Sequence, residues 1–122
     1  MKQKVHSVSY LAKAEFKFMN GVYDLVALPS GAEVVKVSLE VVGIPATATA
    51  TGNISVGFKD ETQKNYFLDN ITINAPIATS AKDYTATSNK VVVAEVKNAS
   101  GNDIKGVLRV LYFLPSVIEV EY

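Results

Sequence analysis

The stretch GVYDLVALPSGAEVVKVSLEVV, residues 21–42, decides the fold of this chain. It contains a short strand, a turn at Pro29-Ser30-Gly31 and a longer strand over residues 33–42. Along the longer strand, branched apolar residues alternate with polar ones, which predicts one buried and one solvated face of a β-sheet. The predicted buried residues are Val35, Val37, Leu39 and Val41, and the predicted solvated residues are Lys36, Ser38 and Glu40.

The rest of the chain repeats this strand pattern. Runs rich in β-branched and aromatic residues are bounded by Gly, Pro, Asn and Asp, and no apolar helical period persists over three turns. We therefore expect an all-β, single-domain β-sandwich of jelly-roll-like type over residues 1–122, with about eight strands and essentially no helix. The predicted strands are residues 5–18, 23–28, 33–42, 54–58, 66–68, 71–73, 90–97, 106–114 and 118–122.

The connections between these strands carry turn signals of different strength. Asn20-Gly21 predicts a hairpin, because this pair favours tight two-residue turns. The run NASGND at residues 98–103 also predicts a turn, whereas residues 43–52 predict an exposed edge or an extended loop. Residues 75–89 predict a loop with one short strand. Residues 106–114 are apolar on both faces, which predicts an interior strand or one covered by a partner.

Composition excludes several classes of protein. The 122 residues contain no cysteine, so neither a disulfide scaffold nor a thiolate zinc site is expected. Twelve basic and twelve acidic residues give a net charge of zero, and Arg109 is the sole arginine, which argues against nucleic acid as a partner. No run approaches the roughly 20 apolar residues that span a bilayer, so no membrane partner is expected.

The sequence offers no catalytic constellation, and we expect no enzymatic activity. His6 is the single histidine and lies in a predicted strand near the end of the chain. The carboxylate pairs Glu33 with Glu40 and Glu119 with Glu121 follow the polar faces of strands instead of lining a cleft. No Gly-x-Ser-x-Gly motif accompanies the serines.

The sequence contains candidate residues for a calcium site and for a sugar-binding site, although a simpler interpretation fits each set of residues. Asp60, Glu61 and Asp69 carry oxygen ligands suited to calcium, but lysines flank them and a solvated turn explains them better. Tyr66 and Tyr84 are candidates for stacking on a sugar, although half-buried packing explains them as well and the chain has no tryptophan. We therefore expect no cofactor and no metal.

Several motifs, in their order along the chain, resemble the capsid decoration, or cement, proteins of tailed bacteriophages. The similarity covers most of the chain but includes no diagnostic functional residue. It implies a β-sandwich on the outer surface of a capsid, commonly a homotrimer that contacts the major capsid protein and is assembled in the host cytoplasm. The matching pieces are FKF at 16–18, VALPSGA at 26–32, the alternating strand 35–41, SVGFKD at 55–60, YFLD at 66–69 and GVLRVLY at 106–112.

Two segments are candidates for subunit contacts. The polar N-terminal arm over residues 1–8 is suited to strand addition at a neighbour's sheet edge, and the small, flat residues 44–51 are suited to lie against another surface. A frayed terminus and a mobile loop remain alternatives. Other virion parts, such as a head–tail connector, tail or fibre subunit, and a carbohydrate- or peptide-binding module also remain open. The candidate interface residues are Lys2, Lys4, Val5, Ile44, Pro45, Thr47, Thr49 and Thr51.

Overall fold

The computed structural model describes residues 2–6, 8–43, 51–73, 77–100, 104–114 and 117–121, and this part of the chain forms strands and no helix. The all-β prediction is therefore confirmed. The strands are β1 (Lys2–His6), β2 (Ser9–Lys17), β3 (Gly21–Leu28), β4 (Glu33–Val42), β5 (Thr51–Phe58), β6 (Leu68–Thr72), β7 (Ile77–Ser80), β8 (Tyr84–Thr85), β9 (Lys90–Ser100), β10 (Lys105–Phe113) and β11 (Val117–Glu121).

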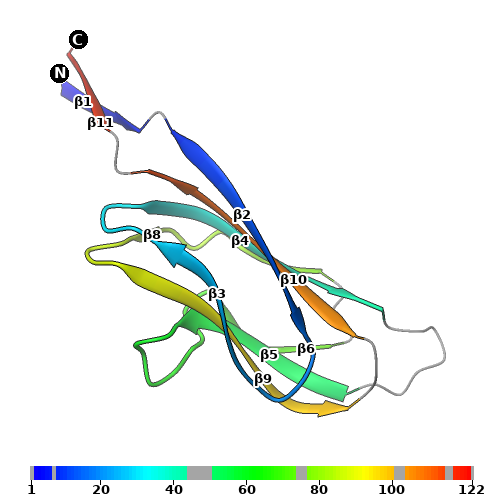
Figure 1. Ribbon diagram of the computed structural model, residues 1–122. Helices are drawn as coiled ribbons and strands as arrows, with labels where there is room; N and C mark the ends of the chain where they lie inside the picture. The colour runs from blue at the N-terminus through cyan, green and yellow to red at the C-terminus, as the bar shows by residue number, and fades with distance from the viewer. Residues whose placement is uncertain are drawn as a thin grey trace.

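Two antiparallel sheets form the body of the molecule (Figure 1). One has the strand order β2-β10-β4-β7, with the short β8 also paired to β4, and the other has the order β3-β9-β5-β6. Successive strands β2, β3, β4 and β5 alternate between the sheets, and the late strands β9 and β10 insert between early ones. The body is therefore a β-sandwich of nine strands, five in one sheet and four in the other.

The core lies between the two sheets and is built from their inward-facing apolar residues. Leu39 and Leu108, which are register partners on β4 and β10, are almost completely buried and contribute to the core from one sheet. Val56 and Ala94, which are register partners on β5 and β9, are fully buried and contribute to the core from the other sheet. No buried polar or charged side chain occurs among the residues whose burial is described, so this interior serves packing.

The strand that was predicted over residues 33–42 forms with those bounds, but its start differs in detail. Leu39 and Val41 are buried as expected, whereas Val35 is only half-buried and Val34 is completely buried. A register shift beside Leu111 and Tyr112, where β4 pairs with β10, explains the change. A β-bulge adds one residue and therefore reverses which residues face the core.

The hairpin predicted at Asn20-Gly21 is wrong. Strand β2 pairs with β10 and β3 pairs with β9, so the chain crosses between sheets at this point. The crossing is held from both sides: Phe18 is buried and its N–H donates to the Ile104 carbonyl (2.9 Å), while Asn20 Oδ1 accepts a hydrogen bond from Ala99 N (2.8 Å). The asparagine side chain thus ties the crossing to β9.

Other strand boundaries also differ from the prediction. The single strand predicted over residues 5–18 is divided into β1 and β2. The two strands predicted at 66–68 and 71–73 are one strand, β6, in which Asn70 adopts a positive φ of 51° and Ser55 Oγ accepts its N–H (2.9 Å). Residues 75–89 contain two strands, β7 and β8, and β9 extends to Ser100, into the predicted turn.

Strands β1 and β11 form a separate two-stranded ribbon beyond one end of the sandwich (Figure 1). Its register pairs Lys2 with Glu121 and His6 with Val117, so the two ends of the chain run side by side. At its base, His6 Nδ1 lies 3.2 Å from the Leu114 carbonyl oxygen, and Leu114 N donates to the Val8 carbonyl (2.8 Å). These contacts join the ribbon to β2 and β10.

Candidate interaction surfaces

The candidate interface residues from the sequence lie at opposite ends of the sandwich. Lys2, Lys4 and Val5 belong to β1 and therefore to the ribbon. Thr51 begins β5 beside Ser100, and its Oγ1 lies 2.7 Å from Ser100 Oγ. Strand β10 runs between these ends, and its nine residues span about 26 Å. Ile44, Pro45, Thr47 and Thr49 lie outside the described residues.

Residues 2–6 of the predicted arm form β1 and are paired within their own chain. Strand β1 is antiparallel to β11, which occupies one edge of the arm. A two-stranded ribbon is marginally stable by itself in water, because it buries little apolar surface.

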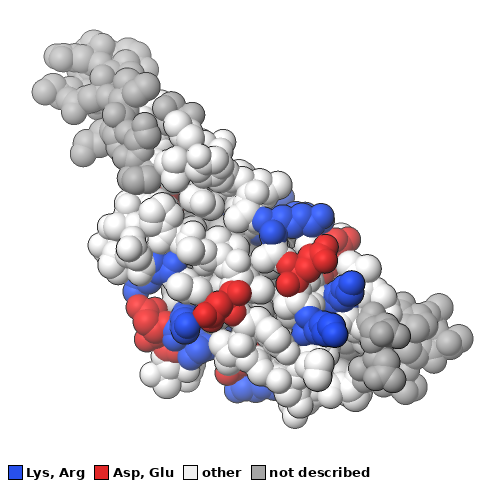
Figure 2. All heavy atoms as spheres, viewed as in Figure 1, with Lys and Arg blue, Asp and Glu red and all other residues white. Residues whose placement is uncertain are grey.

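The sandwich is strongly apolar where it meets the ribbon. We call this the apolar end and define it as Val8, Tyr10, Tyr112, Phe113 and Leu114. Val8 and Tyr10 are exposed, at 37% and 50%, and the rings of Tyr10 and Tyr112 lie 5.9 Å apart. In Figure 2 the surface adjoining the grey residues of the ribbon is largely uncharged. Exposed aromatic and aliphatic side chains gathered in one place are typical of subunit interfaces.

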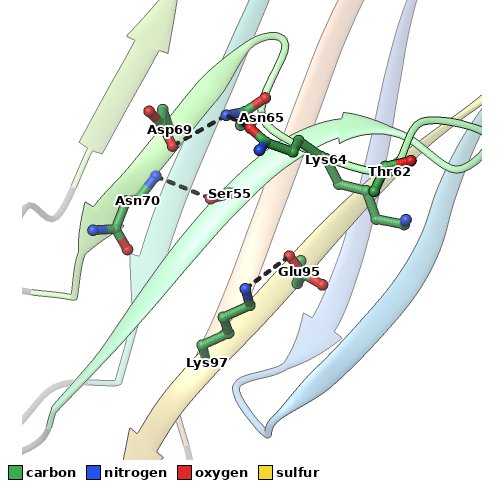
Figure 3. Close-up of a pocket in the computed structure, with 9 residues that line it drawn as sticks. Ser55, Thr62, Lys64, Asn65, Asp69, Asn70, Glu95 and Lys97 are labelled. Atoms are coloured by element: carbon green, nitrogen blue, oxygen red, sulfur yellow. Dashed lines mark hydrogen bonds and ion pairs between the residues drawn. The ribbon is translucent and has the colours of Figure 1, made fainter.

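A polar hollow of about 440 Å³ lies on the outer face of the other sheet (Figure 3). Ser55 of β5 and Glu95 of β9 are register partners on its floor, and the loop after β5 forms one wall. Its lining residues are Ser55, Thr62, Gln63, Lys64, Asn65, Asp69, Asn70, Glu95 and Lys97.

The polar groups of this hollow are largely engaged with one another. Asn65 Nδ2 donates to Asp69 Oδ1 (3.4 Å), and Lys97 Nζ lies 3.6 Å from Glu95 Oε1. Basic and acidic residues are equal in number in the lining, so the hollow has no marked preference for an anion or a cation. The arrangement is that of a solvated surface.

The acidic residues considered for calcium do not converge. Asp60 Oδ2 accepts a hydrogen bond from Lys90 Nζ (2.6 Å), whereas Asp69 faces Asn65 in the polar hollow. The hydrogen bond from Lys90 is the main cause that lowers the pKa of Asp60. Within the described ranges, no three residues among histidine, aspartate and glutamate are grouped as metal ligands.

Tyr66 and Tyr84 are packed in an aromatic cluster and do not form an open platform. Their rings lie 5.3 Å apart, and each contacts Phe58. Lys82 Nζ lies 4.0 Å from the centre of the Tyr66 ring, and Tyr66 Oη donates to the Asp83 carbonyl (3.0 Å). The rings therefore serve packing in this structure.

The remaining single residues of chemical interest are also engaged. Glu33 Oε1 accepts a hydrogen bond from Thr85 Oγ1 (2.7 Å), and Glu40 Oε1 lies 3.3 Å from Arg109 Nη1.

Among the described residues, no helix is long and apolar enough to cross a membrane.

Comparison with solved structures connects this architecture to virus particles. A chain of the acidic stable capsid structure of Helicobacter pylori bacteriophage KHP30 is 75% identical, with 100% of both chains covered and a TM-score of 0.89. The chain belongs to a family of bacteriophage capsid-associated proteins. The phage resemblance seen in the sequence is thus confirmed at the level of capsid association.

A second solved structure extends the fold of this capsid-associated family to a more distant sequence. A chain of the cyanophage Pam1 capsid asymmetric unit is 22% identical, with 88% of this chain and 85% of that chain covered and a TM-score of 0.69. At this identity, the likeness concerns the fold alone. No protein-family model and no curated protein sequence matches the chain.

Membership in this family supports a structural role in the virion. The apolar end was not identified from the sequence. The apolar end could have been recognised from the two-sided apolar pattern of residues 106–114, which indicated a covered strand. Strand β10 is in fact interior, between β2 and β4, and only its last residues contribute to the apolar end.

Proposed function

We propose that this protein is a capsid decoration, or cement, subunit. In this proposal it binds the outer surface of the capsid, contacts the major capsid protein and other copies of itself, and stabilises the shell through these contacts. The observation that carries the proposal is the 75% identity, over the full length of both chains, to a chain of a phage capsid structure. Assembly takes place in the host cytoplasm, and the protein remains on the virion surface.

The distribution of surfaces supports this role. The core has no buried polar or charged side chain among the described residues, and the exposed Val8 and Tyr10 lie together at the apolar end. A homotrimer requires one contact repeated around a three-fold axis, so a single apolar surface with a complementary neighbour is sufficient. We assign the apolar end and the adjoining ribbon to this contact between copies.

The stabilising effect follows from mass action. A subunit that binds intact shells and not disrupted ones stabilises each site by RT ln(1 + [L]/Kd), about 2.7 kcal/mol when its concentration is 100 times Kd. Many sites on one shell add their contributions. Shell disruption should therefore shift to a higher temperature in the presence of the protein.

The test compares phage particles assembled without this chain with the same particles after the purified protein is added. We expect saturable binding at a copy number close to that of the major capsid protein and a higher temperature of shell disruption. Binding of only a few copies per particle would assign the protein to a connector or tail. Absence of binding, or binding without any gain in shell stability, would contradict the cement role.

A further inference from the structure

The outer face of the β2-β10-β4 sheet contains a shallow trough with an apolar floor. The register places Leu11, Leu111 and Lys36 in one row across the three strands, and Lys13, Arg109 and Ser38 in the next. The trough has a volume of about 250 Å³ and is lined by Leu11, Lys36, Ser38, Arg109 and Leu111. Leu11 is 61% exposed, among the most exposed large apolar side chains of the described chain.

Basic groups dominate the sides of this trough. Arg109 Nη1 lies 3.3 Å from Glu40 Oε1, and this contact engages one of the five N–H donors of the guanidinium group. Among the described residues, Lys13 and Lys36 have no carboxylate oxygen within 4.0 Å. The acidic residues Glu15 and Glu40 lie one row farther along the sheet. The trough is thus basic on a chain whose net charge is zero.

Elsewhere on the described surface, several basic groups are paired with an acid. Three lysines outside this sheet each have a carboxylate nearby: Lys59 lies 2.7 Å from Asp24, Lys90 lies 2.6 Å from Asp60, and Lys97 lies 3.6 Å from Glu95. The polar hollow on the opposite sheet also combines equal numbers of basic and acidic residues. Among the described residues, Lys17, Lys64, Lys82 and Lys105 likewise have no carboxylate oxygen within 4.0 Å. What distinguishes the trough is the combination of Lys13 and Lys36, neither of which is paired with an acid, and the exposed Leu11.

We propose that the trough docks an acidic segment of the capsid shell protein. The segment places an apolar side chain on Leu11 and Leu111 and a neighbouring carboxylate against Arg109 and Lys36. This inference rests on the proposed function and adds which face meets the shell and what chemistry that face recognises. Apolar contact at the centre supplies affinity, and the surrounding opposite charges set orientation and the rate of association.

The experiment measures equilibrium binding of the full-length protein to shells assembled without it. The variants are Leu11→Gln and Lys36→Glu, which alter the floor and the side of the trough at residues that are wholly or partly exposed. The matched control is Lys97→Glu, a similar charge reversal in the polar hollow, where the lysine is 68% exposed. Each variant is first checked for an unchanged melting temperature and an unchanged oligomeric state.

We expect Leu11→Gln and Lys36→Glu each to weaken shell binding about tenfold or more, and Lys97→Glu to leave it within about twofold. Added salt should weaken the wild type more steeply than Lys36→Glu, since screening acts on the charge contact that this variant has lost. If Leu11→Gln and Lys36→Glu both bind shells as tightly as the wild type does, this inference is overturned while the cement role remains. Failure of the wild type itself to bind would instead overturn the proposed function.

Discussion

The packing of the Phe16 ring over Gly106 determines whether Gly106→Ala stabilises or destabilises the protein. The two residues are register partners on β2 and β10, and the Phe16 ring occupies the space that a side chain at position 106 would need. A Cβ built on Gly106 lies 2.2 Å from Phe16 Cζ and 2.5 Å from Cε1. The ring cannot easily move, because it is only 6% exposed and stacks on Tyr23 with ring centres 5.4 Å apart.

Two opposing effects determine the result of Gly106→Ala. Overpacking of a well-filled site costs about 1–3 kcal/mol, since the ring must move by about 1.2 Å to reach ordinary contact at 3.4 Å. Replacing glycine in a strand recovers about 0.5–1 kcal/mol of backbone entropy. We therefore expect a net destabilisation of about 0.5–2 kcal/mol, or about 2–8 °C in melting temperature for a chain of this size.

The same substitution should have the opposite sign when the ring is removed. In a Phe16→Val background, Gly106→Ala no longer meets an aromatic ring and should stabilise by about 0.5 kcal/mol. Urea unfolding of the four proteins at one fixed protein concentration measures this double-mutant cycle. If Gly106→Ala stabilises the protein in both backgrounds, the account of the packing at this site is refuted.

Two further predictions concern the loop after β5 and its neighbours. Gly57→Ala would place a Cβ 2.5 Å from the Lys64 carbonyl carbon and 2.6 Å from Asn65 N, so the loop must shift. Limited proteolysis within residues 59–65 should therefore become faster. An unchanged cleavage rate would contradict this packing. Asp60→Asn removes the ion pair with Lys90 that lowers the pKa of Asp60, so the wild type should be the more stable protein at neutral pH. The wild type should lose this advantage as the pH falls below the ordinary carboxyl pKa of 3.8 and through the lowered pKa of Asp60. An advantage that persists in acid would refute that origin.

Local alternation was sufficient to predict the strands that have one buried face. Residues 33–42 form β4 with the predicted bounds, because a period of two is a direct consequence of strand geometry. Only the bulge near Val34 and Val35 was missed. A bulge depends on how β4 pairs with β10, more than 70 residues away in the sequence, and the strand itself carries no sign of it.

The pairing of strands that are distant in the sequence could not be predicted from local sequence patterns. Asn20-Gly21 has the composition of a hairpin turn, yet the buried Phe18 and the hydrogen bond from Ala99 to Asn20 direct the chain into the other sheet. The basic trough was missed for the same reason. Lys13, Lys36 and Arg109 are far apart in the sequence and come together only through the register of three strands.

The location of the protein in the particle tests the central claim most directly. A cryo-electron microscopy reconstruction of purified particles of the phage that encodes this chain would show where the sandwich lies. The account predicts repeated copies on the outer surface of the shell, with the outer face of the β2-β10-β4 sheet turned toward the major capsid protein. Density for the sandwich only inside the shell, or only at the tail vertex, would contradict it.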